Sequence, residues 1–262
     1  MKKIQAIYRR ELNAYFKSPI GYVLLAIFVF VSSLYFAVNL LGYYANIATE
    51  LNFMQGLFFV LIPILTMKTF AEERRSGTEI LLFTAPITTP QIVIGKYLAA
   101  LTLFLIMTAT TLIHVVITVL LQGTVDVLLL GTYVGFILSG AVYISIGVLI
   151  SSMTSNQIIA AIVSVVIFIG FMLLDAIASL LGNFTTTILQ NLDFLNLLSA
   201  RQEAAAGQAV TAAVTWINPA TRLVDFASGI FRLTPIVFLI SFTLLFLYLT
   251  VQVLERRRWT QS

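Results

Sequence analysis

The sequence contains no cysteine and only one histidine, His114. Without cysteine the chain has no disulfide, no thiol nucleophile and no Cys-ligated zinc, and with one histidine it has no multi-histidine metal site. Charged residues are also scarce. They make up 10% of the 262 residues, whereas a soluble domain carries roughly 25%. These absences exclude the common metal centres and argue against a water-soluble fold.

Apolar residues, in contrast, are abundant: 60% of the chain is hydrophobic and the mean hydropathy is +1.00. A domain of this size has too much surface for its volume to hide so many apolar side chains from water. A lipid bilayer accepts them, and a crossing helix needs roughly 20 mostly apolar residues. We therefore predict an all-α integral membrane protein with six transmembrane helices in a single domain, residues 1–262. The predicted spans are Ile20–Leu41, Leu51–Met67, Tyr97–Leu121, Leu128–Ile150, Ile158–Leu181 and Pro235–Leu254.

Two of these runs need comment. The first follows a basic N-terminus, but it is longer than the roughly 7–15 apolar residues of a cleavable signal peptide, so we expect it to be retained. The second is short, and we expect Pro63 to kink it, because proline removes a backbone hydrogen-bond donor.

The basic residues are distributed unevenly along the chain. Twelve of the 15 Lys and Arg residues fall on one side of a six-span topology, and only Arg201, Arg222 and Arg232 fall on the other. Lys and Arg mark cytoplasmic loops. We therefore expect both termini in the cytoplasm and the chain in the plasma or inner membrane. Basic clusters beside apolar spans carry topology information, so the net charge of +4 does not indicate nucleic acid.

Shorter amphipathic segments accompany the spans. Lys3–Lys17 has apolar residues near helical spacing and a basic opposite face, which suits a helix in the cytoplasmic membrane interface. Pro219–Leu233, in the long external loop 182–234, has a similar apolar stripe, and Pro219 stands where a first-turn proline is tolerated. Ile188–Leu198 is less regular. A helix that merely covers lipid or neighbouring spans would show the same pattern.

Catalytic motifs are missing. Gly95-Lys96 is followed by Tyr97, and Pro90 stands where a phosphate-binding loop requires glycine. His114 lies in the third span, where a lone polar side chain is more often a hydrogen-bonded packing group than a catalyst. Asp175 lies about 25 Å along the fifth span, near the outer interface, where a solvated or hydrogen-bonded carboxylate is the milder explanation. We expect no enzyme activity, metal or cofactor in this chain.

The cytoplasmic connection 68–96 is the most informative segment. Glu72–Arg75 forms a charged turn in which side chains three residues apart could pair. Gly77 follows, and then comes an apolar run, Ile80–Phe83, which is too short to span and is ended by Pro86. An exposed apolar run at this face needs a partner. The pattern alone allows either the bundle itself or another protein.

This stretch resembles the loop between spans 2 and 3 of ABC-2 type transporter permeases, in particular the gliding-motility-associated and copper/nitrous-oxide-type permease subunits. The resemblance also extends to both ends of the chain. The residues that carry it are Met67, Phe70–Glu79, Leu81-Leu82, Thr84–Pro86, Gly95–Ala99, Arg10–Leu12, Tyr15–Tyr22, Asn218–Phe226, Gly229 and Glu255–Trp259.

The resemblance implies a permease subunit of an ATP-binding-cassette transporter with a type V exporter-like fold. Six spans would form half of a dimeric pathway with a second permease subunit, identical or different. ATP and Mg²⁺ would be bound by a separate ATPase subunit present in two copies, which agrees with the missing phosphate loop. Most members of this family export their cargo.

The resemblance also implies roles for individual residues. A coupling helix would dock on the ATPase, with charged residues setting the electrostatics and Ile80, Leu82 and Phe83 supplying buried contact. Its residues are Glu72, Glu73, Arg74, Arg75, Gly77, Thr78, Glu79, Ile80, Leu82 and Phe83. An interfacial elbow helix would contain Arg9, Arg10, Tyr15 and Phe16, and an external re-entrant helix would contain Pro219, Arg222 and Phe226.

Two other functions remain open. An ATP-independent carrier would need ionisable groups near the middle of the membrane or paired broken helices, and the sequence indicates neither. A membrane scaffold for a cytoplasmic complex is compatible with the same composition. The cargo cannot be read from the sequence, although apolar spans favour a lipid-like, amphipathic or peptide cargo over a small ion.

Overall fold

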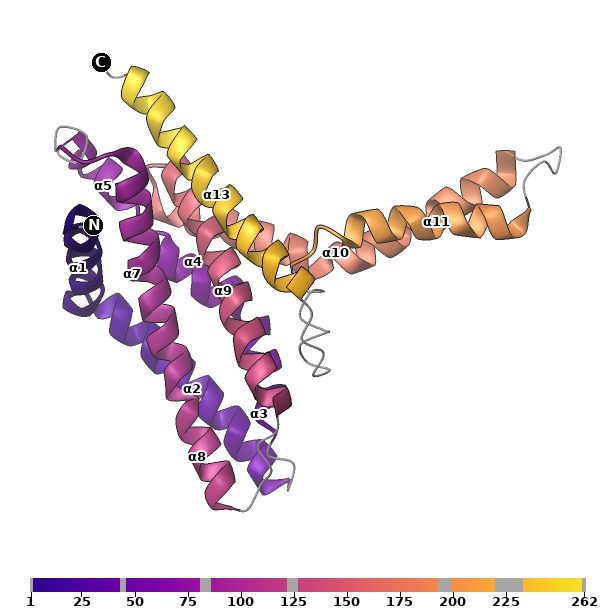
Figure 1. Cartoon of the computed structure of the whole chain (residues 1–262), viewed down its shortest axis with the longest axis horizontal. Helices are drawn as coiled ribbons and strands as arrows, with labels where there is room; N and C mark the ends of the chain where they lie inside the picture. Colours follow the sequence, from indigo (N-terminus) through magenta and orange to yellow (C-terminus); the bar gives the residue numbers. More distant parts are fainter. Residues whose placement is uncertain are drawn as a thin grey trace.

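The computed structural model describes residues 2–42, 46–80, 86–121, 127–192, 199–219 and 233–260. Every regular element in these ranges is a helix, and Figure 1 shows a bundle from which one helical hairpin projects. The elements are α1 (Lys2–Lys17), α2 (Pro19–Leu41), α3 (Ile47–Gly56), α4 (Phe58–Thr66), α5 (Ala71–Arg75), α7 (Thr89–Thr110), α8 (Leu112–Leu120), α9 (Val127–Met153), α10 (Gln157–Leu192), α11 (Ala200–Thr215) and α13 (Leu233–Thr260).

Five helices are long and apolar enough to cross a membrane: α2, α7 continued by α8, α9, α10 and α13. The pair α3–α4 passes the same test but is bent by 60°, and it would make a sixth span. The all-helical, multi-pass membrane fold predicted from the composition is therefore confirmed. The number six stays a prediction.

The bend in the second predicted span does not lie at Pro63, as the sequence suggested. Pro63 is inside α4, and the break lies earlier, at Leu57. Gly56 precedes the break, and glycine lowers helix stability by about 1 kcal/mol relative to alanine. The helix therefore breaks where its backbone is least constrained, and the proline is accommodated within the next helix.

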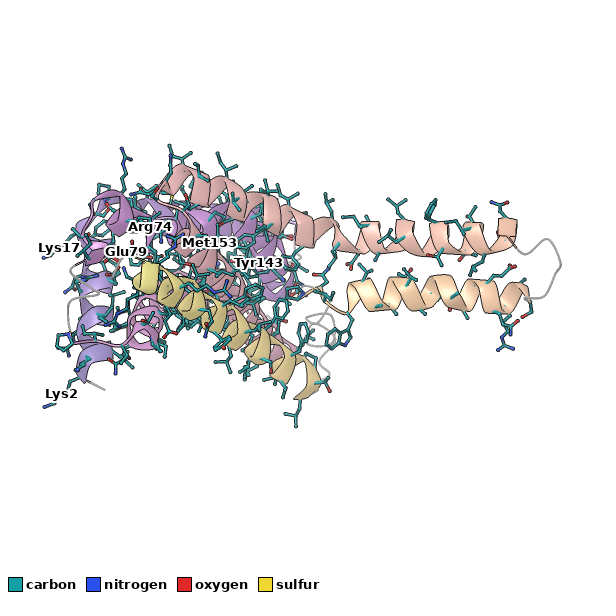
Figure 2. All side chains as sticks on the ribbon, turned by 90° about the horizontal axis from the view of Figure 1, so that it is seen from above. Lys2, Lys17, Arg74, Glu79, Tyr143 and Met153 are labelled. Atoms are coloured by element: carbon teal, nitrogen blue, oxygen red, sulfur yellow. The ribbon has the colours of Figure 1, made fainter. Side chains whose placement is uncertain are left out.

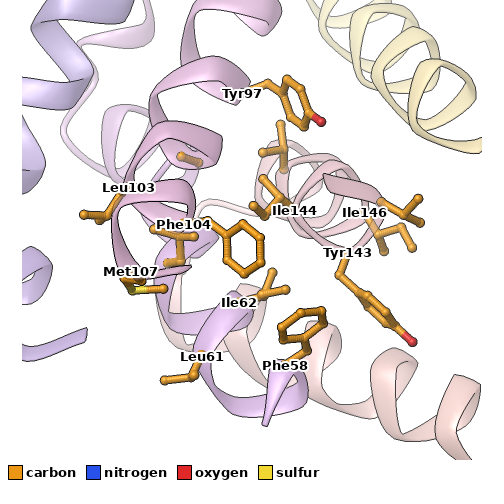
Figure 3. Close-up of a cluster of buried hydrophobic side chains, with 14 of the residues drawn as sticks. Phe58, Leu61, Ile62, Tyr97, Leu103, Phe104, Met107, Tyr143, Ile144 and Ile146 are labelled. Atoms are coloured by element: carbon orange, nitrogen blue, oxygen red, sulfur yellow. The ribbon is translucent and has the colours of Figure 1, made fainter. Parts of the chain in front are cut away.

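The core surrounds α9, which is the most buried of the candidate spans. Four aromatic rings meet here, with paired centroids 4.9–5.8 Å apart: Phe58, Phe104, Phe136 and Tyr143. Figure 3 shows how the rings of α4, α7 and α9 approach one another. A Cβ atom at Gly140 would lie 2.3 Å from the Phe104 ring, so this glycine allows α7 to lie close against α9. Tilted and edge-on pairs of this kind add to the burial of apolar surface.

The outside of the bundle is apolar as well. Large hydrophobic side chains such as Phe30 on α2, Met172 on α10 and Leu244 on α13 are more than 60% exposed. A water-soluble monomer rarely shows so much contiguous apolar surface. In this fold the surface faces lipid or a second protein chain.

The segment predicted as an external loop, 182–234, is instead partly a helical hairpin. Helix α10 does not end at Leu181 but continues to Leu192, and α11 packs back along it (Figures 1 and 2). Gly182 and Gly207 face each other so closely that a Cβ on either would lie within 2.7 Å of the other's carbonyl oxygen. Glycine here serves close helix packing rather than helix termination.

The base of the hairpin returns to Asp175. The Asn218 side chain donates a hydrogen bond of 3.1 Å to Oδ1 of Asp175, and Thr211 Oγ1 donates one of 3.2 Å to the Ala178 carbonyl. Asp175 is therefore a hydrogen-bonded carboxylate, as the milder sequence interpretation expected.

Candidate functional site

The charged segment predicted from the sequence to couple to an ATPase forms α5 and the turn after it. Its side chains divide into two groups. Glu72, Arg75, Thr78 and Ile80 are exposed, whereas Glu73, Arg74 and Glu79 are partly or fully buried. The exposed group is available to a partner, and the buried group holds the segment against the bundle.

Glu73 belongs to a group of four charged side chains that we name the inner charge network: Arg10, Glu11, Glu73 and Lys96. Lys96, on α7, is only 1% exposed, and its Nζ lies 2.9 Å from Glu73 Oε2 and 3.2 Å from Glu11 Oε1. It also donates a hydrogen bond of 2.6 Å to the Thr69 carbonyl. Arg10 Nη2 contacts the same two carboxylates, at 2.6 Å to Glu11 and 2.5 Å to Glu73. Two cations and two anions thus join α1, α5 and α7.

Electrostatics agree with this pairing. Burial lowers the pKa of the Arg10 guanidinium, but the Glu11 and Glu73 carboxylates outweigh burial, so the net shift of the pKa is upward. Burial, together with the Glu11 carboxylate, raises the pKa of Tyr15. The Tyr15 hydroxyl therefore stays protonated and donates a 2.9 Å hydrogen bond to the Leu65 carbonyl of α4.

A second pair stabilises the turn after α5. Gly77 adopts a positive φ of 73°, a conformation that glycine enters without steric cost. Glu79 lies 3.3 Å from Arg74 Nε, and Arg74 also donates a 2.8 Å hydrogen bond to the Ser152 carbonyl. The pairing within Glu72–Arg75 that the sequence suggested is wrong, because Glu73 and Arg74 find partners elsewhere and Glu72 faces Lys68 at 3.8 Å.

Ser151, in the last turn of α9, provides the start of α5 with a cap. Its Oγ accepts hydrogen bonds from the Phe70 and Ala71 amides at 3.1 and 3.2 Å and donates one to the Met67 carbonyl at 3.0 Å. The first amides of a helix have no partner within the helix and need one from outside. The cap therefore ties α5 to the turn between α9 and α10.

Helix α1, the predicted interfacial elbow, is packed against α7. Ile7 is buried, and a Cβ on Gly95 would lie 2.8 Å from its side chain. Phe16 contacts Tyr22 edge to face at 6.0 Å between ring centroids, and Arg9 is exposed. The elbow and α5 therefore share α7 as a common support.

The charged segment was predicted from the sequence, but the residues that hold it against the bundle were not. Glu11, Lys96 and Ser151 were given no role in the site, because nothing in a single sequence pairs positions so far apart. Leu82 and Phe83 of the predicted coupling helix, and Arg222 and Phe226 of the predicted re-entrant helix, lie outside the described residues. Pro219 is buried in a turn.

A cavity of about 410 Å³ lies between α1 and α5 and is lined by both charged groups and hydroxyls. Its lining includes Glu11, Tyr15, Glu72 and Thr78. Within the described part of the chain, no three His, Asp or Glu side chains gather to hold a metal ion.

The family described as ABC-2 family transporter protein matches residues 20–201, which include α5 and all its supports except α1. The chain belongs to this family. A search of curated proteins found no match to the sequence. As an ABC-2 transporter protein the chain is the non-catalytic membrane subunit, and the family implies an ATP-binding subunit as its partner. The gliding-motility or copper subtype stays a prediction.

Proposed function

We propose that this ABC-2 protein is the permease subunit of an exporter in the plasma or inner membrane. It forms the cargo pathway with a second permease subunit, identical or different. Two copies of a separate ATPase subunit bind ATP and Mg²⁺ and drive the cycle from the cytoplasm. The exposed apolar faces of α2, α10 and α13 support both a lipid environment and a second chain.

The observation that carries the proposal is the bracing of α5. Lys96 and Glu73 link it to α7, Arg10 links it to α1, and Ser151 links it to the end of α9. Force applied to the exposed residues of α5 therefore reaches three other helices. Helix α1 leads directly into α2, so movement of the elbow also tilts the first span.

The cargo follows from the composition of the spans. The membrane helices are almost entirely apolar, which favours a lipid-like, amphipathic or peptide cargo. This part of the proposal rests on composition, and the coupling role of α5 does not depend on it.

Glu72 offers the sharpest test of coupling. Its carboxylate is exposed and lies 3.8 Å from Lys68, so Glu72→Lys changes the docking charge without touching the inner charge network. We expect a roughly tenfold or greater loss of ATPase stimulation, since a reversed charge at an interface costs about 1.4 kcal/mol or more. The measurement is ATP hydrolysis by a phosphate-loop ATPase that copurifies with the chain and is reconstituted together with it in lipid.

The matched control is Gln208→Lys, an exposed position on the hairpin, which should stimulate as the unmodified chain does. Reversal at Glu73 is less clean, because it also breaks the inner charge network. Normal stimulation by Glu72→Lys would contradict docking through this face. Cargo transport with no ATPase present would favour an independent carrier, and copurification without transport would favour a scaffold.

A further inference from the structure

A second buried polar group lies far from α5, and we name it the outer polar cluster: Ser32, Ser33, Glu50 and His114. Glu50 is 1% exposed, and its Oε1 lies 2.8 Å from His114 Nδ1 and accepts a hydrogen bond of 2.5 Å from Ser32 Oγ. The other ring nitrogen of His114 lies 3.2 Å from Ser33 Oγ. The imidazole stacks on Phe36 with 4.4 Å between ring centroids.

This cluster lies within the apolar part of the helices. Ser32 precedes the end of α2 at Leu41 by nine residues, about 13 Å, and His114 precedes the end of α8 at Leu120 by about 9 Å. The sequence indicated neither ionisable groups near the middle of the membrane nor paired broken helices. The structure places a Glu–His pair inside the bundle and bends α3–α4 by 60°. The pair was missed because the hydropathy run that defined the second span begins just after Glu50, while the helix begins at Ile47.

The cluster holds one carboxylate and one imidazole, and no fixed positive charge lies on the described helices around it. The sequences of α2, α3, α4, α8 and α9 contain no Lys or Arg. Among the described residues of these helices, Tyr133 also faces the pair, and its hydroxyl lies 2.7 Å from Thr111 Oγ1. An ionised Glu50 beside a neutral imidazole would leave one negative charge uncompensated. Burial of such a charge in an apolar environment is strongly unfavourable.

One oxygen of the Glu50 carboxylate lacks a partner in the described part of the chain. Oε2 of Glu50 is buried and has no hydrogen-bond partner among the described residues. Ser33 can either donate to the second ring nitrogen of His114 or accept from it, so the cluster can hold a proton there without rearranging.

We propose that the outer polar cluster takes up one exchangeable proton. The proton is added to the Nε2 lone pair of His114, and the Ser33 hydroxyl turns from hydrogen-bond donor to acceptor. Because the cluster joins α2, α3 and α8, its occupancy controls how firmly the ends of these helices are held together. This inference does not rest on the ATPase.

The test uses the purified full-length chain in lipid nanodiscs, without the ATPase. The thermal unfolding midpoint is measured while NaCl replaces choline chloride at constant ionic strength, and separately from pH 5 to 9 in choline chloride. Glu50→Gln removes the charge but keeps the shape. Asp175→Asn, which alters a carboxylate elsewhere, is the control.

The unmodified chain and Asp175→Asn should gain at least about 2 °C on acidification, and Glu50→Gln should lose that gain. The reason is that a site that takes up a proton on folding stabilises more as the pH falls. Identical responses of the unmodified chain and Glu50→Gln to pH, or a gain with sodium and none on acidification, would overturn the proposal. If Glu50→Gln fails to fold, His114→Gln decides: it should lose the response to acidification, and it overturns the proposal if it keeps that response in full.

Discussion

Lys96 is the residue on which the inner end of the bundle depends most. A lysine 1% exposed is tolerated only when its charge is paired, and here two carboxylates and a carbonyl oxygen surround it. Arg10 shares both carboxylates from the more exposed side. The elbow and the coupling segment are therefore joined through one buried amine.

Replacement of Lys96 by methionine should be costly. Lys96→Met keeps the apolar stem but leaves Glu11 and Glu73 facing an apolar group, and breaking a buried pair costs about 3–5 kcal/mol. Lys68→Met removes a partly exposed lysine 3.8 Å from its partner and should cost less than about 1 kcal/mol. Denaturant or thermal unfolding in detergent distinguishes them. Equal stability of the two variants would show that the network contributes nothing.

For single residues, the sequence predicted which side chains belong to the charged segment better than it predicted which of them are buried. The charged motif marked the predicted coupling segment, but it could not show that Glu73, Arg74 and Glu79 face inward while Glu72 and Arg75 face outward. Burial depends on which helix lies alongside, and that information is spread over positions as distant as Glu11 and Ser151. Glu50 was missed for a related reason: a window average places it beside a span, whereas packing places it within the bundle.

Among the elements, the hairpin of α10 and α11 differs most from expectation. The fifth span was predicted to end at Leu181, and residues 182–234 were predicted to form an external loop. In the structure small residues allow two backbones to touch, with Thr186 and Thr211 packed over the opposing glycines. Small residues are used in this way where helices approach closely. A periodicity argument based on large apolar residues does not detect such a contact.

The hairpin contact predicts a clear response to added bulk. In Gly207→Val the new Cβ would lie 2.1 Å from Thr186 Oγ1 and 2.6 Å from the Gly182 carbonyl. Overpacking of this kind costs about 1–3 kcal/mol, so amide hydrogen exchange in 178–191 and 200–215 should accelerate about tenfold or more. Ala205→Val, at an exposed position on the same helix, should leave exchange nearly unchanged. Acceleration in both variants alike would assign the effect to helix propensity instead.

For the whole molecule, composition was sufficient to predict a helical membrane protein, because no other environment accepts so much apolar surface. The fold does not show which of its ends faces the cytoplasm, so the orientation predicted from the basic residues stays a prediction. The absence of cysteine makes it directly testable, because an introduced thiol is the only one in the chain.

Single cysteines at Lys17 and Gln208, both exposed, should react differently in intact cells. A membrane-impermeant maleimide should label Gln208→Cys from outside, and it should label Lys17→Cys only after permeabilisation. The opposite pattern would invert the topology and place α5 outside the cell, where no ATPase could reach it. The unmodified chain, which has no cysteine, gives the background level of maleimide labelling.

Helix α10 has a mechanical consequence. Its 36 residues make it about 54 Å long, against a hydrocarbon layer of roughly 30 Å, and it starts beside the turn that caps α5. The 16 residues of α11 brace its far part over about 24 Å. A swing of about 10° where the hairpin leaves the bundle would sweep its tip by ~4 Å, so a rigid tilt of α10 among the other spans would carry the hairpin tip through a comparable distance.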